Sequence, residues 1–415
     1  MKLLDHPAGP TCSIPVPPRS PSPSAGRSLR VALFSGNYDC VRDGANQALN
    51  RLVAHLLGHR GTDVRIYSPR TPKPAFASVG TVRAVRSISL PGRPEYRLAL
   101  GFTRAARADF DAFRPDIVHL SAPDLLGRQA QKYARARGVP VIASLHTRFE
   151  TYAEHYRLGF LRPVIERYLD RFYGDCDHIL APTRPIAIDL GARHGARRVS
   201  VWGRGVDHRL FRPSLRCDRL RAAHGYGPGD VVPLFFGRLV VEKGLAVFAE
   251  AIEILRHRGR KIRPLIVGQG PARDWLARRL PNAVFAGHLE GVALGRMIAS
   301  ADILINPSAT EAFGNVNLEA MASGLAIVSA DVDSAAALIA NGRDGLLVPP
   351  GEALGFADAA EALIDDALRR QKLGRMAQEA AARYRWDDVL HGVLDRYDHC
   401  LARPFARHTV PGGEI

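Results

Sequence analysis

Short apolar runs that do not alternate with polar residues recur along the chain, and a segment of helix length follows each of them. In the first half they lie at Val31–Ser35, Val64–Ser68, Ile117–Ser121, Val139–Leu145, Ile179–Pro182 and Val199–Trp202. The series restarts at Val232–Phe236, Pro264–Val267, Ala283–Ala286, Ile303–Asn306, Ala326–Ser329 and Gly345–Val348. Strands that are apolar on both sides are typical of parallel sheets covered by helices on both faces. The pattern therefore predicts an α/β protein with two doubly wound domains.

Glycine and proline gather at residues 203–230, which marks the boundary between the two domains. We expect a first domain at residues 29–205 and a second at residues 206–383. Residues 1–28 contain seven prolines among small polar residues, so we predict a disordered tail there and a second tail at 403–415. Open α/β sheets bind ligands at the carboxyl ends of their strands, which makes the cleft between the domains the expected site.

The charge of the chain is unevenly distributed. The net charge of +16 divides into +15 for residues 1–210 and +1 for residues 211–415. A basic half points to an anionic partner, which is a nucleic acid, a membrane surface or a phosphorylated substrate. The alternative is a general bias toward arginine, but such a bias would be expected to affect both halves.

Cysteine usage and hydropathy limit the cellular setting. The five cysteines are scattered without a C-x-x-C pair, which predicts neither a zinc cluster nor a disulfide framework and fits a reducing cytoplasm. No run approaches about 18 consecutive apolar residues, and the N-terminus lacks the apolar core of a secretory signal. We therefore predict a cytoplasmic protein whose membrane contact, at the inner face of the cell membrane, is peripheral.

The segment from Glu311 to Glu319 carries the sharpest chemical signal. It follows the strand expected at Ile303–Asn306, and a glycine-containing turn leads into a helix that begins near Asn315. Backbone N–H groups at such a helix start bind anions and suit a diphosphate. The carboxylates of Glu311 and Glu319 flank this anion site and could bind sugar hydroxyls. The alternative is that Glu311 interacts only with the helix dipole and that Glu319 is a surface residue.

Two cations follow the first strand of the second domain. That strand ends at Gly237, Arg238 stands at its carboxyl edge, and Lys243 lies five residues further on at the start of a helix. Fixed cations at this edge neutralise a pyrophosphate and stabilise it as it departs. The alternative is a solvated arginine and lysine on a loop.

With these residues the chain resembles the glycosyltransferase family 4 enzymes of the GT-B fold, in which two Rossmann-like domains face each other across a cleft. The resemblance covers nearly the whole chain after residue 29 and rests on Gly237-Arg238-Leu239, Glu242-Lys243-Gly244, Pro307-Ser308 and Glu311 to Gly324. It implies a retaining hexosyltransferase that uses a nucleotide diphosphate sugar and needs neither cofactor nor metal. It further implies that Arg238 and Lys243 hold the diphosphate, that Glu319 binds the ribose and Glu311 the donor sugar, and that the remaining donor contacts come from Gly237, Phe313, Gly314, Asn315 and Val316.

The first domain agrees with this resemblance. The strand at Val139–Leu145 delivers His146 to the cleft edge, where enzymes of the family place a histidine near the donor sugar. The loop from Asn37 to Gly44 resembles the family's glycine loop over the donor phosphates. A glycine pair common in that loop reads Asp43-Gly44 here, so Gly44 is assigned to donor binding and the role of Asp43 is open.

One subgroup of the family fits more closely. His146-Thr147, Tyr152-Ala153 and Trp202-Gly-Arg-Gly-Val-Asp207 look like the GDP-mannose-dependent α-mannosyltransferases and the sulfoquinovosyl-diacylglycerol synthases, both of which put sugars on membrane lipids. We favour GDP-mannose as donor and a membrane lipid or lipid-linked acceptor. The alternative is a transferase of glucose, glucuronic acid or sulfoquinovose from a UDP-sugar to a glycolipid or polysaccharide.

The basic surplus has two candidate locations. Residues 83–107 hold six arginines and one acid, and residues 158–173 alternate apolar residues with arginines at helical spacing. Such a helix fits an anionic membrane surface, and a core-facing helix with a solvated basic face is the alternative. A basic nucleic-acid-binding protein is the non-enzymatic alternative, but we find no nucleic-acid-binding motif.

Two further predictions concern metals and the C-terminus. Asp175-Cys-Asp177 and Asp331-Val-Asp333 match a short D-x-D metal motif, which is a frequent chance match, and we predict no metal ligand. In GT-B enzymes a final helix crosses back onto the first domain, so we assign residues 384–402 there.

Overall fold

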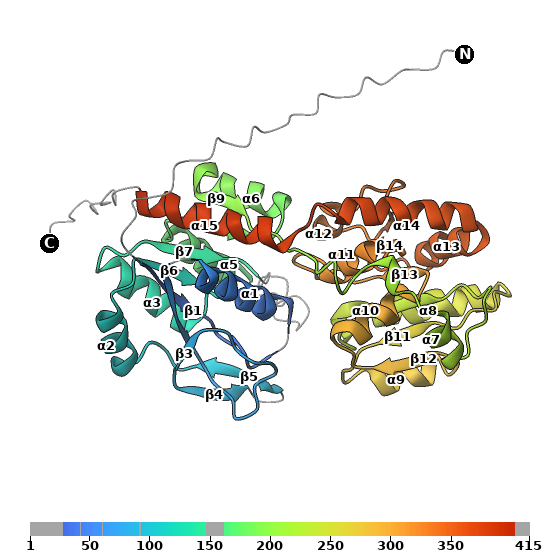
Figure 1. Ribbon diagram of the computed structural model, residues 1–415, viewed down its shortest axis with the longest axis horizontal. Coiled ribbons are helices and arrows are strands. Elements are labelled where there is room, and N and C mark those ends of the chain that lie inside the picture. The colour runs from blue at the N-terminus through green and yellow to red at the C-terminus, as the bar shows by residue number, and fades with distance from the viewer. Residues whose placement is uncertain (1–27, 42, 60, 91–92, 147–161, 403–415) are drawn as a thin grey trace, which may run out of the picture.

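The computed structural model describes residues 28–41, 43–59, 61–90, 93–146 and 162–402. Figure 1 shows two lobes side by side, each built on its own sheet. The first sheet has the strand order β3-β2-β1-β6-β7-β8-β9 and is parallel throughout. Its strands are β1 (Leu29–Phe34), β2 (Thr62–Ser68), β3 (Thr81–Ala84), β6 (Ile117–Leu120), β7 (Val141–Ser144), β8 (His178–Ala181) and β9 (Val199–Val201). Its helices are α1 (Gly44–Gly58), α2 (Arg104–Phe113), α3 (Leu125–Arg135), α5 (Arg162–Gly174) and α6 (Arg184–His194), with the short 3-10 helix η2 (Ala196–Arg198).

The second sheet is also parallel, with the order β12-β11-β10-β13-β14-β15. Its strands are β10 (Pro233–Phe236), β11 (Leu265–Val267), β12 (Val284–Gly287), β13 (Ile303–Asn306), β14 (Ala326–Ala330) and β15 (Leu346–Val348). Its helices are α7 (Asp218–Ala223), α8 (Leu245–His257), α9 (Arg273–Arg279), α10 (Gly291–Ala299), α11 (Asn315–Ala322), α12 (Asp333–Ala336), α13 (Ala353–Asp365) and α14 (Ala367–Ala381), with the 3-10 helices η3 (Pro213–Leu215) and η4 (Val241–Lys243). The strand order reverses beside β1 in the first sheet and beside β10 in the second, which is the Rossmann pattern. The predicted doubly wound fold is confirmed.

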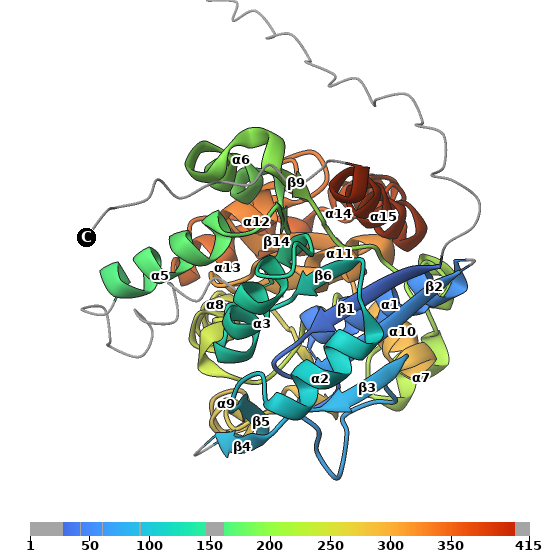
Figure 2. The same cartoon turned by 90° about the vertical axis from the view of Figure 1, so that its left-hand side faces the viewer.

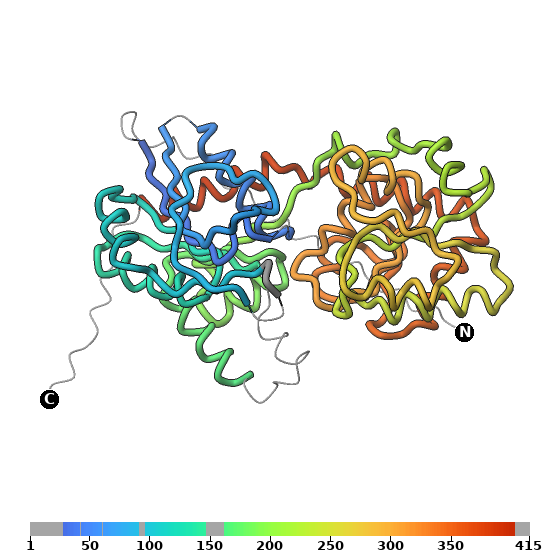
Figure 3. The backbone as a smooth tube through the Cα atoms, turned by 90° about the horizontal axis from the view of Figure 1, so that it is seen from below, coloured from blue at the N-terminus to red at the C-terminus, as the bar shows by residue number. Residues whose placement is uncertain are grey.

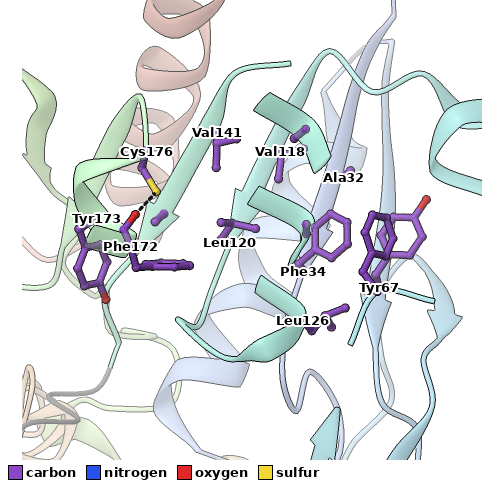
Figure 4. Packing of buried hydrophobic residues seen from close by; sticks show 14 of the residues in the cluster. Ala32, Phe34, Tyr67, Val118, Leu120, Leu126, Val141, Phe172, Tyr173 and Cys176 are labelled. Atoms are coloured by element: carbon purple, nitrogen blue, oxygen red, sulfur yellow. Dashed lines mark hydrogen bonds between the residues drawn. The ribbon is translucent and has the colours of Figure 1, made fainter. Parts of the chain in front are cut away.

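Apolar side chains from both faces of each sheet form the cores. Figure 4 shows part of the first core, where Phe34 and Tyr67 stack with ring centroids 4.7 Å apart. On the other side of that core the Cys176 thiol donates a hydrogen bond to the carbonyl of Phe172 at 3.4 Å. Phe172 is buried, so the C-terminal end of α5 faces the core. This supports the core-facing alternative for that part of the helix, while residues 158–161 lie outside the described residues.

A short antiparallel hairpin departs from the predicted pattern. It consists of β4 (Ser87–Leu90) and β5 (Arg93–Ala99), which pair with each other outside the two main sheets. Figure 2 shows the hairpin at the lower edge of the first lobe. These strands were not predicted because one face of the ribbon is exposed, so the segment lacks the continuous apolar run that marks a buried strand.

The segment between the lobes contains more structure than a linker. It includes η3 and α7, where the buried Arg221 contacts Asp302 at 3.0 Å. The chain then builds the second lobe and returns to the first, a path that Figure 3 shows from below. The last helix, α15 (Trp386–Ala402), lies over the first lobe in Figure 1. Its buried residues Leu390, Val393 and Tyr397 share a core with β1 and α1.

Candidate active site

The carboxyl end of β10 begins the site. The next residue, Gly237, has a φ of +141°, and a Cβ built on it would lie 3.9 Å from Cγ2 of Val316. The loop after β10 therefore lies against the first turn of α11. Arg238 and the segment from Gly314 to Val316 are in this way brought to the same edge of the sheet.

The two predicted cations have defined partners at this edge. The Arg238 guanidinium donates a hydrogen bond of 3.2 Å to the Tyr96 hydroxyl of the first lobe and lies 3.6 Å from the Glu242 carboxylate. The Lys243 ammonium contacts the Glu311 carboxylate at 2.6 Å. Both members of the Lys243–Glu311 pair are largely buried, so the pair is better shielded from water than a surface ion pair. The Glu311 carboxylate is therefore held at the cleft by a specific cation.

The start of α11 is a helix N-terminus with a rigid base, a type of element that can bind an anion. Gly314, with a φ of +87°, precedes the helix and has no side-chain oxygen to cap the first N–H groups. Asn306, at the end of β13, donates from its amide to Asn317 Oδ1 at 2.9 Å, and Asn317 donates to Ser329 Oγ at 3.0 Å. Because these three side chains are buried, they fix the helix against the sheet. The helix N-terminus is consequently preorganised for an anion.

The start of α1 in the first lobe faces the start of α11. A Cβ built on Gly44 would overlap Nδ2 of Asn315, so the two helix starts nearly touch. Asp43 caps α1 by accepting a hydrogen bond of 2.8 Å from the Asn46 N–H. Burial raises the pKa of Asp43, and the positive charges of Arg238 and Arg204 act in the opposite direction. Asp43 therefore places a carboxyl group among the cations of the site.

Phe313 contributes its side chain to packing. Its ring lies 3.3 Å from a Cβ built on Gly203, and its centroid is 6.4 Å from that of Tyr384. The ring is buried between the segments that join the two lobes. Any donor contact from Phe313 therefore comes from its backbone.

His146 belongs to a buried chain of hydrogen bonds. Arg204 donates to His146 Nδ1 at 2.8 Å, and His146 Nε2 lies 2.8 Å from Ser144 Oγ. The chain continues from Ser144 Oγ to His119 Nε2 at 2.8 Å, and from His119 Nδ1 to the Tyr397 hydroxyl at 2.6 Å. Because a guanidinium only donates, Nδ1 of His146 accepts, which places the proton of the neutral ring on Nε2. Both ring nitrogens are thus used within the protein, and a hydrogen bond from the ring to a ligand would require Arg204 to leave Nδ1 or Ser144 to leave Nε2.

The surroundings of this chain of hydrogen bonds keep its two histidine rings neutral. Burial lowers the pKa of His119 to about 3, and burial lowers the pKa of His146 well below its ordinary value, with Arg204 and His119 adding to the effect. Burial also lowers the pKa of Arg204 to about 10, while Asp43 opposes that shift. The guanidinium therefore stays charged at neutral pH and directs a fixed positive charge toward the Asp43 side of the cleft.

Glu319 lies one turn further along α11. Burial raises the pKa of its carboxyl to about 8, although Arg51 of α1 partly opposes the shift. Arg51 lies 3.9 Å from the Asp207 carboxylate and 5.0 Å from the ring of Trp386. Glu319 is therefore not an ordinary surface carboxylate but a partly buried one that faces the basic first lobe.

The raised pKa of Glu319 predicts a pH dependence of stability. Between the ordinary value of 4.5 and about 8, the folded protein keeps the proton and the unfolded chain loses it. The free energy of unfolding therefore falls as pH rises through this range, by at most about 1.4 kcal/mol per pH unit for this group. In urea titrations from pH 5 to pH 8, we expect Glu319→Gln to lose less stability with rising pH than the wild type. Parallel curves for the two proteins would contradict this prediction.

The structure thus collects the predicted residues from both lobes and adds others. The predicted residues of the second lobe lie at one edge of its sheet, and Gly44 faces them; they are Gly237, Arg238, Lys243, Glu311, Gly314, Asn315, Val316 and Glu319. Arg204, Tyr96 and Arg51 were not predicted. For Arg204 the signal was its place in the Trp202-Gly-Arg-Gly-Val-Asp207 segment, but its contact with His146 joins residues that are far apart in the sequence.

Comparisons with known proteins agree with this architecture. A family described as "Glycosyltransferase Family 4" matches residues 42–210, and one described as "Glycosyl transferases group 1" matches residues 230–366. A GDP-mannose-dependent alpha-mannosyltransferase of Mycolicibacterium smegmatis is 32% identical over 381 residues, covering 90% of this chain and 98% of the relative. The chain belongs to glycosyltransferase family 4. The family therefore supports the prediction of a glycosyltransferase and not the alternative of a nucleic-acid-binding protein.

The names of other relatives and of solved structures indicate other sugars. A sulfoquinovosyl transferase of Arabidopsis thaliana is 30% identical, covering 88% of this chain and 72% of the relative. Among solved structures, a sucrose-phosphate synthase from Thermosynechococcus elongatus matches with a TM-score of 0.74 at 19% identity, covering 90% of this chain and 99% of that one. Anabaena HepE in complex with UDP-glucose matches with a TM-score of 0.68 at 20% identity, covering 89% of this chain and all of that one. The structural matches confirm the GT-B fold. In the described part of the chain, none of the helices is both long and apolar enough to cross a bilayer.

Proposed function

We propose that this family 4 enzyme transfers mannose from GDP-mannose to a membrane lipid or lipid-linked acceptor with retention of the anomeric configuration. The observation that carries the transferase chemistry is the convergence of two helix starts, Arg238 and the Lys243–Glu311 pair at the cleft. The relative from Mycolicibacterium smegmatis supports the choice of GDP-mannose. The choice of a lipid as acceptor is supported by an exposed apolar surface on the first lobe.

The cleft residues divide the reaction between them. As the bond between sugar and phosphate breaks, negative charge grows on the diphosphate, and Arg238, Lys243 and the start of α11 stabilise it. Glu311 binds hydroxyls of the donor sugar, and Glu319 binds the ribose. The acceptor hydroxyl attacks the face from which the diphosphate leaves, and a phosphate oxygen takes its proton. Closure of the lobes excludes the water that would otherwise hydrolyse the donor.

These cations supply the charge that a bound metal provides in other transferases, so we propose that transfer needs no metal. Purified protein with labelled GDP-mannose, other GDP- and UDP-sugars and a membrane lipid extract tests the donor and acceptor. We expect a lipid product from GDP-mannose, with the α-anomeric configuration by proton NMR and an unchanged initial rate in EDTA. A β-linked product would overturn retention, and loss of the rate in EDTA would overturn metal independence.

A UDP-sugar is the second candidate donor, since Anabaena HepE, whose structure is similar, binds UDP-glucose. The same panel separates the candidates by competition. If GDP-mannose is the donor, unlabelled GDP inhibits the reaction at lower concentration than UDP does. Stronger inhibition by UDP than by GDP would favour a UDP-sugar as the donor.

The acceptor side of the proposal rests on the β4–β5 hairpin. Ile88 and Leu98 are direct cross-strand partners and are 51% and 52% exposed. Leu90 and Leu100, which lie two residues after Ile88 and Leu98, are also exposed. As direct partners, Ile88 and Leu98 lie on one face of the ribbon, and together with the exposed Leu90 and Leu100 nearby they are called the hairpin patch. Tyr96 on the same strand contacts Arg238, so the hairpin patch lies beside the cleft.

Charge complementarity argues for an anionic bilayer as the occupant of the hairpin patch. The side chains of Arg83, Arg86, Arg104 and Arg107 are exposed on the segments that flank the hairpin, within the half of the chain that carries +15. Apolar insertion combined with basic residues at headgroup level is the usual arrangement of peripheral membrane proteins. A bilayer docked there would present a lipid acceptor close to Arg238.

Sedimentation with vesicles tests the hairpin patch. We expect the wild type to bind vesicles that contain phosphatidylglycerol and to be released by salt, and we expect the double variant Ile88→Ser, Leu98→Ser to bind at least about tenfold more weakly. The matched control is Leu354→Ser, Leu368→Ser, which removes exposed leucines from the second lobe and should bind as the wild type does. Equal binding by both double variants would contradict membrane docking by the hairpin patch. The proposed transfer chemistry would be unaffected.

A further inference from the structure

Three histidines meet on the outer side of the first lobe, where α1 packs against α15. His55 lies in the last turn of α1, His59 directly follows that helix, and His391 comes from α15. Their ring centroids are 4.7 to 5.5 Å apart, and one ring nitrogen of each lies within 4.8 Å of those of the others. The chain between His59 and His391 spans almost the whole protein, so only the fold brings the rings together.

We propose that His55, His59 and His391 form a binding site for a divalent transition-metal ion of the Zn²⁺ class, which fastens the C-terminal helix α15 to α1. Nothing in the transferase chemistry uses these residues. The site is therefore a structural one that is separate from the donor site.

The hydrogen bonds of the three rings favour metal binding. The Nδ1 of His391 lies 2.8 Å from the carbonyl of Asp387, and the Nδ1 of His59 lies 3.3 Å from the carbonyl of His55. A backbone carbonyl accepts, so Nδ1 of each ring carries the proton and leaves the lone pair of Nε2 for a metal. A ligating histidine commonly donates its other ring N–H to a carbonyl in this way.

His55 supplies a second, independent observation. Its Nε2 atom is buried and has no hydrogen-bond partner among the described residues. A buried polar atom without a partner destabilises the fold, and a metal ion at this position would remove that cost.

The geometry and surroundings suit such an ion. Three nitrogens bound at about 2.0–2.1 Å around a tetrahedral Zn²⁺ lie roughly 3.4 Å apart, so the ring nitrogens must approach one another by up to about 1.4 Å. His59 and His391 are exposed and can make this adjustment by side-chain rotation. Asp398, two turns after His391 on α15, interacts electrostatically with His59 and adds a negative charge near the site. Imidazole ligands favour Zn²⁺, Ni²⁺ and Cu²⁺ over Mg²⁺ and Ca²⁺.

A metal site of this kind departs from the prediction of no metal ligand, which rested on the scattered cysteines and two D-x-D segments. The Asp175 carboxylate of one segment is occupied by Arg128 and Arg135, each at 2.7 Å, and the Asp177 carboxylate accepts from the Val141 N–H. The available signal in the sequence was the spacing of two histidines four residues apart at the end of α1. The third ligand comes from the other end of the chain.

The test uses the full chain without a histidine tag, freed of metal by chelator and then titrated with Zn²⁺ in a calorimeter. We expect one ion bound per chain, a rise in melting temperature on addition of Zn²⁺, and visible d–d absorption of a tetrahedral site with Co²⁺. His391→Gln and His59→Gln change exposed side chains, and each should weaken Zn²⁺ binding at least about tenfold and abolish the rise in melting temperature.

The matched control is His257→Gln, an exposed histidine on α8 that should bind Zn²⁺ as the wild type does. Equal Zn²⁺ affinity in the His391→Gln, His59→Gln and His257→Gln variants would overturn the proposal, because binding would then come from elsewhere on the chain. Absence of binding by the wild type at micromolar Zn²⁺ would overturn it as well. Neither outcome bears on the donor site, whose residues are unchanged in these variants.

Discussion

Lys243→Ala is expected to lower kcat/KM for sugar transfer by about 10³-fold or more, which corresponds to about 4 kcal/mol of transition-state stabilisation. The Lys243 ammonium stands at the carboxyl edge of the second sheet, next to the start of α11, where the proposed diphosphate gains charge as it leaves. It also holds Glu311 through a contact of 2.6 Å. The variant therefore loses a cation and releases the carboxylate assigned to the donor sugar.

The contact between the two side chains makes a sharper test possible. Glu311→Ala alone should be similarly impaired, and the double variant should lose much less than the product of the two single effects, because each single change already breaks the pair. The rates come from steady-state transfer with a radiolabelled donor, and circular dichroism and melting temperature confirm the fold. The control is Lys261→Ala, an exposed lysine of the same lobe, which should keep full activity. Full activity of Lys243→Ala would contradict the assignment of Lys243 to the diphosphate.

Arg204→Met is the second change with a large expected effect. The buried guanidinium donates to His146 Nδ1 at 2.8 Å, and its positive charge partly opposes the rise that burial causes in the pKa of the Asp43 carboxyl. Methionine fills a similar volume but leaves His146 Nδ1 without its donor and Asp43 without a nearby buried charge. We expect kcat to fall by about 10²-fold or more, and the free energy of unfolding to fall by about 1–3 kcal/mol, because a buried acceptor loses its partner.

A pH profile separates positioning from a loss of stability alone. In the wild type Arg204 fixes His146 with its proton on Nε2, whereas in Arg204→Met the ring is able to take a proton on Nδ1, and its pKa should rise. Because burial, the larger cause, still lowers that pKa, we expect the variant's kcat to fall on the acid side at a higher pH than the kcat of the wild type does. The matched control is Arg209→Met, which removes an exposed arginine of the same segment and should leave both kcat and its pH profile unchanged. A pH profile of Arg204→Met identical to that of the wild type would show that Arg204 acts on stability only.

The sequence determined the two-domain architecture because a parallel strand covered on both faces must be apolar along its whole length, a local property that a single chain displays directly. The same holds for the elements that we propose bind the diphosphate. The glycine at the end of β10 and the cation beside it are consecutive in the sequence, and the helix start at Asn315 closely follows β13. Their placement at one carboxyl edge follows from the Rossmann order. The β4–β5 hairpin was missed because the exposed Ile88 and Leu98 face away from any core.

Only the tertiary structure decided which distant residues share a site. Arg204 meets His146 across 58 positions, and Tyr397 reaches His119 across 278. No local pattern encodes such contacts, since they depend on how helices and strands pack once the chain is folded. The sequence therefore determined the fold and predicted which segments meet at the candidate site. Burial and packing decided which charges face one another, and with them the raised pKa of Glu319, the neutral state of His146 and the meeting of the three histidines between α1 and α15.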